Sequence, residues 1–315
     1  MIEYLARRIA TSIVVLLGIS LLSFVLLHLI PGSPGRAILG PRAPEVSVAA
    51  FNRAQGYDDP VVVQYVHYLD RLAHGDLGFS YHLNQSVGSL LATRAPQSAF
   101  LSGSALVIAL LIAIPLGIFQ AVRRNSVADQ ILTSLAFVGY SLPSYLIGLV
   151  LIWALAIYVP ILPAQAPQGN SLIAIVSNPA GLVLPIATLS AVTVASFSRY
   201  MRSSALDTLA QDYIRTAKAK GLSMWSVLLH HVVRNSSIPI ITLIGLSVPN
   251  LLAGNLIAET VFNVNGLGLM FFNSLSTLDY PVLLAYTLIG AVLTVVGNLA
   301  ADIATALADP RVRRA

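Results

Sequence analysis

Few side chains in this 315-residue chain could do covalent or metal chemistry. The chain has no cysteine, so thiolate metal ligands and disulfides are excluded. His230 and His231 are adjacent and must point to different faces of a helix, and no H-x-x-x-H or H-E-x-x-H spacing occurs. A G-x-x-x-x-G-K-[ST] phosphate loop is also missing. We therefore expect no enzymatic activity, no cofactor and no metal site in this chain.

Three polar side chains lie within or beside apolar runs of the sequence, namely Glu259, Asn298 and Asp302. An ionisable group inside a bilayer is a candidate functional residue by default. Glu259 and Asp302 fall near the ends of their runs, where water reaches them, so we favour packing or interfacial roles over contact with a substrate. Asn298 lies deeper and is expected to hydrogen-bond a neighbouring helix.

The elements that would position these residues are long apolar helices. Hydrophobic residues make up 56% of the chain and charged residues 10%, whereas soluble domains carry about 25% charged residues. The first apolar run, 9–30, would form a helix of about 33 Å, enough to cross a bilayer core of about 30 Å. It exceeds the apolar h-region of a cleaved signal peptide, which is about 7–15 residues long, so we expect it to remain as the first helix. Five further runs follow, at about 98–122, 131–158, 181–201, 239–258 and 282–305. The fold class expected is an all-α membrane protein with about six transmembrane helices.

The distribution of lysine and arginine predicts the orientation. With the N-terminus in the cytoplasm, the short outside loops at 159–180 and 259–281 contain no basic residue. We therefore predict cytoplasmic termini in a plasma (inner) membrane, a first helix at 1–30, an extracytoplasmic segment at 31–96, a transmembrane domain at 97–306 and a tail at 307–315. The net charge of +5 comes from residues at run ends and does not indicate nucleic-acid binding. The basic residues placed inside are Arg7, Arg8, Arg123, Arg124, Arg199, Arg202, Arg215, Lys218, Lys220, Arg234, Arg311, Arg313 and Arg314.

The largest predicted cytoplasmic loop, about 203–237, has the pattern of two helices. Helical spacing predicts one mostly apolar stripe, followed by Gly221 as a left-handed cap. Ser223 would then cap a second helix from 224 to about 234. From the pattern alone, this pair of helices is either a hairpin resting on the bilayer or a lever that contacts a cytoplasmic partner. The residues of the stripe are Leu206, Leu209, Tyr213, Ala217 and Lys220.

The same loop resembles a family motif. The sequence Y-I-R-T-A-K-A-K-G at 213–221 is similar to the EAA loop of type I bacterial ABC importer permeases, with Arg215 in place of the usual acidic residue. Further motifs are G-D-L-G-F-S at 75–80, S-L-P-S at 141–144, E-T-V-F at 259–262 before G-L-G at 266–268, D-Y-P at 279–281 and D-P-R at 309–311. Asn265 stands where proline is usual. Together they resemble the B-type subunit of dipeptide and oligopeptide permeases, a group with nickel and glutathione relatives.

This resemblance implies a five-part importer for peptides, or alternatively for nickel, glutathione or another small ligand. The partners implied are a second homologous permease subunit, two ATPase subunits that bind ATP and Mg, and an extracytoplasmic substrate-binding protein, which the segment 31–96 would help to seat. The ATPase-coupling residues would be Arg215, Thr216, Ala217, Lys218 and Gly221. Two rival classes are disfavoured by the residues themselves. A secondary transporter would need midplane carboxylates, and an intramembrane protease would need a nucleophile–base pair or a metal motif.

Overall fold

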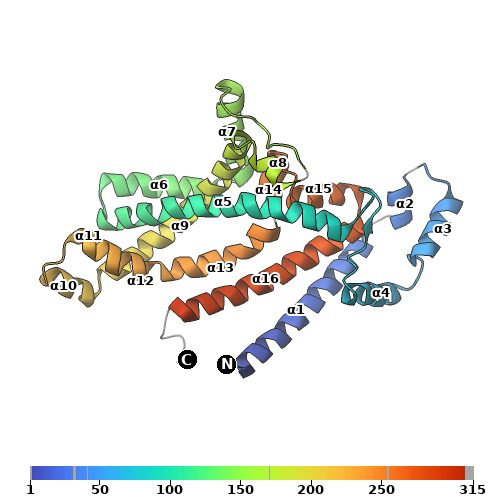
Figure 1. Cartoon of the computed structure of the whole chain (residues 1–315), viewed down its shortest axis with the longest axis horizontal. Coiled ribbons are helices and arrows are strands. Elements are labelled where there is room, and N and C mark those ends of the chain that lie inside the picture. The colour runs from blue at the N-terminus through green and yellow to red at the C-terminus, as the bar shows by residue number, and fades with distance from the viewer. Residues whose placement is uncertain (1, 31–32, 41, 170, 254, 309–315) are drawn as a thin grey trace.

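A computed structural model describes residues 2–30, 33–40, 42–169, 171–253 and 255–308 as an elongated bundle of helices (Figure 1). The helices that run along its length are α1 (Ile2–His28), α5 (Val87–Val122), α9 (Ala180–Leu209), α13 (Ile238–Ala253) and α16 (Tyr280–Ala308). α5 packs along α9, α13 lies against α5 and α16, and α1 contacts α16. The helical fold class predicted from the sequence is confirmed.

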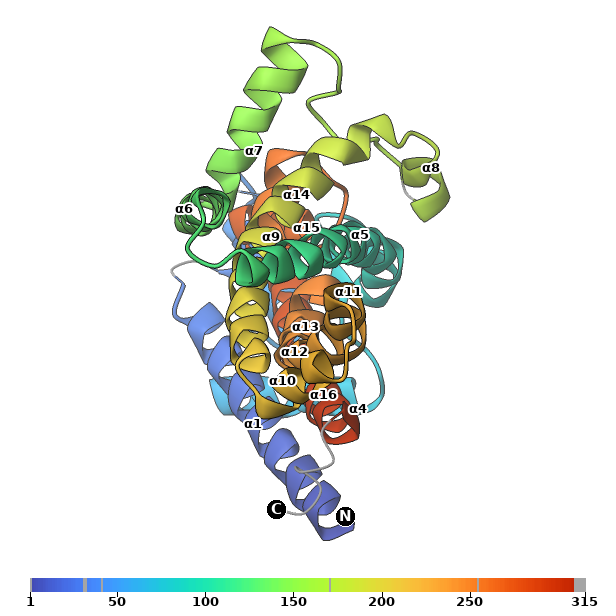
Figure 2. The same cartoon turned by 90° about the vertical axis from the view of Figure 1, so that its left-hand side faces the viewer.

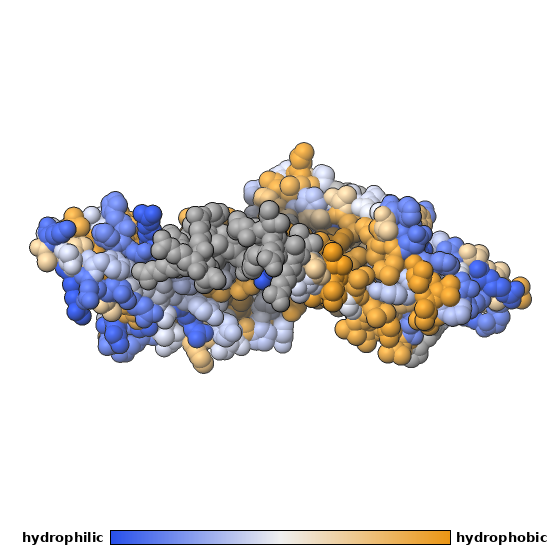
Figure 3. All heavy atoms as spheres, turned by 90° about the horizontal axis from the view of Figure 1, so that it is seen from below, coloured by the Kyte–Doolittle hydropathy of each residue, from blue (hydrophilic) through white to orange (hydrophobic). Residues whose placement is uncertain are grey.

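Within the part of the chain that the structure describes, four helices are long and apolar enough to cross a membrane, and the number rises to six if each of two bent pairs is one span. The single helices are α1, α5, α9 and α16. Their outer sides expose large apolar residues, including Val14 on α1 and Leu111 on α5. Seen from below, hydrophobic residues gather between the hydrophilic ends of the molecule (Figure 3). Lipid would cover such a surface, because a soluble protein rarely exposes a large continuous apolar patch.

The apolar run at 131–158 is bent, and it is not one straight helix. α6 (Val127–Ser141) and the helix formed by α7 (Ser144–Ile152) with a π-helical end, Trp153–Tyr158, meet at 102°. Leu142 is extended between them, with φ −78° and ψ 135°. Pro143 explains this break, because a residue before proline is sterically disfavoured in the α conformation. α7 consequently extends away from the bundle in both views (Figures 1 and 2).

The fifth predicted run, 239–258, contains most of α13 and the start of the next helix, and a bend precedes it. A helical stretch made of α11 (Met224–Val227), a π-helical turn (Leu228–Val233) and α12 (Arg234–Ser236) meets α13 at 45°. After α13 the chain enters two shorter helices, α14 (Leu256–Val261) and α15 (Leu267–Thr277). The Asn255 side chain accepts a hydrogen bond from the Ala258 amide and so caps α14.

The segment between α1 and α5 lies at the end of the bundle opposite α10 (Asp212–Ala219) and α11 (Figure 1). It contains α2 (Pro34–Leu39), α3 (Glu45–Gln55), α4 (Val61–Ala73) and a small antiparallel hairpin, β1 (Phe79–Ser80) with β2 (Gln85–Ser86). Tyr68 from α4 packs with Phe24 and Leu284, and the Ser80 hydroxyl donates to the Asp279 carboxylate. A further short helix, α8 (Leu172–Val176), precedes α9.

Candidate functional site

The α10–α11 turn, residues 212–227, forms one tip of the molecule (Figure 1). Gly221 has φ +80°, and its amide donates to the Lys218 carbonyl at 3.0 Å. A Cβ at Gly221 would meet no atom within 4 Å, so the demand for glycine is conformational and not steric. The Ser223 hydroxyl accepts from the Ser226 amide at 3.3 Å and caps α11. The left-handed glycine and the serine cap predicted from the sequence are both present.

The buried face of α10 differs from the predicted stripe. Ile214 is 1% exposed and Ala217 is buried, whereas Tyr213 is 43% exposed and Lys220 is exposed. α9 ends at Leu209, so Leu206 and Leu209 belong to a different helix from α10. The break at 210–211 changes the helical phase, which is why a stripe drawn across both helices selects Tyr213 and misses Ile214, although it includes Ala217 correctly.

The α10–α11 turn is held to the bundle by apolar packing. Ile214, Ala217 and Val227 belong to one buried cluster with residues of α5 and α9, among them Ile118 and Met201. α9 then runs without a helix break from Leu209 back to Ala180. Burial of apolar side chains is the main contribution that joins such elements. A displacement of α10 would therefore be passed to the long helices α5 and α9.

The opposite side of α10 is polar and faces outward. Arg215, Thr216 and Lys218 are exposed, as is Gly221. Arg215 makes an ion pair with Asp212 at 3.3 Å, but the side chains are 77% and 94% exposed. Exposed pairs of this kind contribute little to stability. Four of the five residues predicted for coupling are thus exposed, while Ala217 faces the interior.

Glu259 on α14 lies at the other end of the bundle and is fully enclosed. Its carboxylate accepts from the Ser98 hydroxyl at 2.7 Å and from the amides of Asn255, Gly268 and Leu269 at 3.1, 2.7 and 3.2 Å. Because these amides include the first turn of α15, the carboxylate also faces the positive end of that helix dipole.

The surroundings of Glu259 leave no room beside it. A Cβ on Gly266 would collide with the Glu259 carboxylate and with the Ser98 hydroxyl. The Ser98 hydroxyl also accepts from the Leu267 amide at 2.8 Å. The carboxylate therefore ties α5, α14 and α15 together, and it has no face open to a solute.

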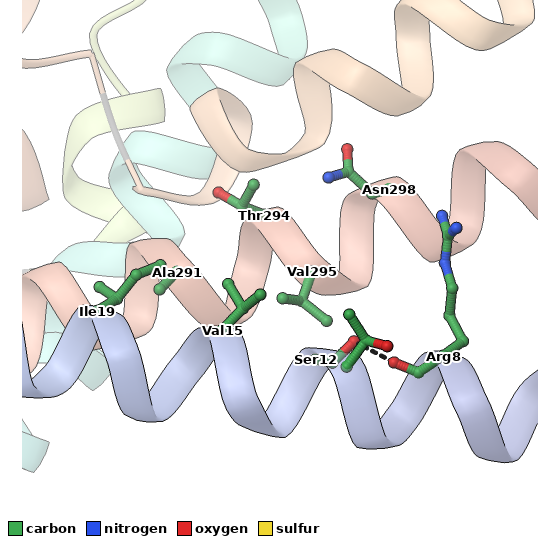
Figure 4. Close-up of a pocket in the computed structure, with 9 residues that line it drawn as sticks. Arg8, Ser12, Val15, Ile19, Ala291, Thr294, Val295 and Asn298 are labelled. Carbon is green, nitrogen blue, oxygen red and sulfur yellow. Dashed lines mark hydrogen bonds between the residues drawn. The ribbon is translucent and has the colours of Figure 1, made fainter.

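Asn298 on α16 lines a cavity of about 440 Å³ that opens between α16 and α1 (Figure 4). Thr294 and Val295 lie beside it on the same helix, and Arg8 and Ser12 come from α1. Asp302 belongs to α16, but its side chain lies outside the described part of the structure. Within the described residues, no three or more histidine or acidic side chains are grouped so that they could hold a metal ion.

An ion pair that sequence reasoning missed joins α6 to α9. Asp129 is 2% exposed, and its carboxylate accepts from Nε and Nη2 of Arg202 at 2.7 and 2.8 Å. The Asn125 amide donates to the same carboxylate at 3.0 Å. The two partners are 73 residues apart in the sequence, so no local spacing could indicate the pair.

Comparison with known proteins gives a consistent result along the whole chain. Residues 113–314 match the model of the "Binding-protein-dependent transport system inner membrane component" family. Residues 1–102 match the model of the N-terminal part of such membrane components.

Curated relatives of full length are also similar to this chain. It is 38% identical over 314 residues to the oligopeptide transport system permease protein AppB of Bacillus subtilis, with 99% of both chains covered. It is 33% identical over 336 residues to the dipeptide transport system permease protein DppB of Escherichia coli, again with 99% of each covered. The glutathione transport system permease protein GsiC of Salmonella choleraesuis is 34% identical over 313 residues, with 99% of both covered.

Proposed function

Because this chain belongs to the family of inner membrane components of binding-protein-dependent transport systems, we propose that it is the permease subunit through which an ATP-driven importer moves peptides into the cell. The observation that carries the mechanism is the α10–α11 turn. Its apolar side is fixed to α5 and α9, and its basic side is exposed. This is the arrangement needed by an element that receives force from outside the subunit and passes it to spanning helices.

The proposed partner at this turn is a cytoplasmic ATPase subunit. Arg215, Thr216 and Lys218 would contact its surface, and Gly221 would allow the chain to reverse without strain. ATP and Mg would be bound by two such subunits, since this chain has no phosphate loop. Closure of the ATPases would move the α10–α11 turn, and the packing of Ile214 and Ala217 against the bundle would pass that movement to α5 and α9.

The proposed topology places the α10–α11 turn and both termini in the cytoplasm of a cell with this chain in its inner membrane. The absence of basic residues from 159–180 and 259–281 supports this orientation. The segment 31–96 would then lie outside and help to seat a substrate-binding protein. A second homologous permease subunit would complete the membrane part, with 97–306 as the transmembrane domain of this one. The role proposed for Glu259 is to hold α14 and α15 in place, and that for Asn298 and Asp302 is helix packing.

The proposed substrate is a dipeptide or an oligopeptide. Full-length relatives carry the names of dipeptide and oligopeptide permeases. The alternative that a specific observation favours is glutathione, because one relative of comparable identity is named for glutathione transport. Nickel or another small ligand would use the same machine, whereas a secondary transporter would need no ATPase.

Uptake of labelled di- and oligopeptides tests this function, in cells that keep or lack this gene and have all other components. We expect ATP-dependent uptake to disappear with the gene and to return when the gene is restored. Unchanged peptide uptake in the deletion strain would contradict peptide import. Uptake of labelled glutathione and nickel in the same strains would then identify which alternative holds.

A further inference from the structure

A small polar pocket lies beside the first turns of α5, at the end of the molecule opposite the α10–α11 turn. It has a volume of about 160 Å³. Two leucines, Leu83 and Leu90, form its apolar wall. Its polar groups are Gln85, Thr93, Arg94, Gln97 and Asn265. Ligand sites for whole drug-sized molecules are usually about 300 Å³ or more, so this pocket has room for one end of a solute.

Arg94 supplies a cation to this pocket. Its guanidinium donates to the Asn265 side-chain oxygen. Among the residues that the structure describes, no carboxylate lies within 4.0 Å of the Arg94 nitrogens. Glu259 has its own hydrogen-bond donors and acts on Arg94 only at longer range. A guanidinium has five N–H donors in a planar fork that matches a carboxylate, so most of this capacity is available to an anion.

The side chain of Gln97 supplies a hydrogen-bond acceptor to this pocket. Its side chain is 2% exposed, and its Nε2 donates to the Gly169 carbonyl at 3.2 Å. That contact fixes the orientation of the amide, because Oε1 could not face a carbonyl oxygen. Oε1 is buried and has no hydrogen-bond partner within the described residues. An unsatisfied buried acceptor is costly, and because Gln97 lines the pocket, a ligand N–H would satisfy this one once a small movement of the side chain exposes Oε1.

The two groups together require a ligand that carries a carboxylate with an N–H donor close to it. We propose that this pocket binds the C-terminal residue of a peptide, with its carboxylate on Arg94 and its backbone N–H on Gln97. The inference rests on the peptide import proposed above. It places a carboxylate-binding site on the permease itself, at the end where a peptide would enter.

Binding to the purified transporter, with both permease subunits and both ATPases but without the binding protein, tests this site. The probes are trialanine and its C-terminal amide, which differ only in the carboxylate. We expect the wild-type complex to bind the free acid about tenfold more tightly, because a hydrogen bond to a charged group is lost with the amide. In the Arg94→Gln complex this preference should disappear. Gln97→Glu should lower affinity for the free acid most, because it adds a negative charge beside the bound carboxylate.

The matched control is Arg53→Gln, which removes an exposed arginine of α3 at the same end of the molecule and should leave the preference unchanged. Damage to the fold would weaken binding of both peptides equally, whereas loss of the site affects only the free acid. Equal binding of the two peptides by wild type, or a preference that survives both Arg94→Gln and Gln97→Glu, would overturn the inference. Trialanine uptake by the complete wild-type system is measured alongside. If that uptake occurs, only the pocket assignment fails, and if no peptide is taken up, the proposed function fails.

Discussion

The two ends of this molecule use polar residues in opposite ways. At the α10–α11 turn, Arg215 and Lys218 point outward, and apolar side chains hold the turn to the bundle. At the other end, the Glu259 carboxylate is enclosed and four donors from the same chain hold it. At the first end the charged side chains are exposed, and at the second the charge is satisfied by hydrogen bonds that hold the backbone in place. Substitutions should therefore affect transport at the first end and stability at the second.

Glu259→Ala should have the largest effect on stability. It leaves four donors, the Ser98 hydroxyl and the amides of Asn255, Gly268 and Leu269, without the acceptor they have in the native protein. Each buried donor left unsatisfied costs about 1–3 kcal/mol, so we expect the free energy of unfolding to fall by at least about 4 kcal/mol. The measurement is the thermal midpoint of the purified subunit in detergent. Glu259→Gln keeps one acceptor oxygen and should lose less, and equal midpoints for Glu259→Ala and wild type would contradict the enclosed network.

Asp129→Ala should have the second largest effect on stability. We expect the free energy of unfolding to fall by about 3 kcal/mol, because the substitution leaves Arg202 beside α6 without its carboxylate. The Arg202 side chain is 25% exposed, which places the loss at the lower end of the range for buried pairs. Asp212→Ala is the matched control, since it removes an aspartate from an exposed ion pair with Arg215. Denaturant unfolding of both variants checks the comparison. A larger loss for Asp212→Ala than for Asp129→Ala would reverse the expected order.

Gly221→Val should have the smallest effect on stability and a large effect on transport. A side chain at φ +80° costs about 1–2 kcal/mol, and the open space around Gly221 adds no collision. The subunit should still fold and assemble, while substrate uptake falls by at least about tenfold. Uptake and co-purification of the ATPase subunits are measured together. Gly103→Val controls for a bulky residue at an open position within α5, where φ is helical.

Much of this architecture is predictable from the sequence, because composition and run length alone indicate long apolar helices. Gly221 and Ser223 could be assigned as caps because helix ends depend on local backbone conformation. The bend at Pro143 also has a local cause, but a run defined only by hydropathy continues through it. The prediction for α10 was right for Ala217 and wrong for Tyr213, because the break after Leu209 has no strong signal in side-chain type.

Contacts between distant segments could not be predicted in the same way. Glu259 is recognisable as an unusual carboxylate, yet its Ser98 partner lies 161 residues away. Asp129 and Arg202 each look like ordinary charges near the ends of apolar runs. Their pairing follows from the packing of α6 on α9, and a single sequence does not show which helices pack together.

We propose that an ATPase subunit binds this chain at the α10–α11 turn. The chain has no native cysteine, so Lys218→Cys can carry a cysteine-reactive photo-crosslinker at that single position. Arg53→Cys provides the same probe at the opposite end of the molecule. In membranes that contain the whole transporter, we predict a covalent permease–ATPase product from Lys218→Cys and none from Arg53→Cys. No product from Lys218→Cys in a transporter that still imports its substrate, or equal products from both positions, would contradict the account.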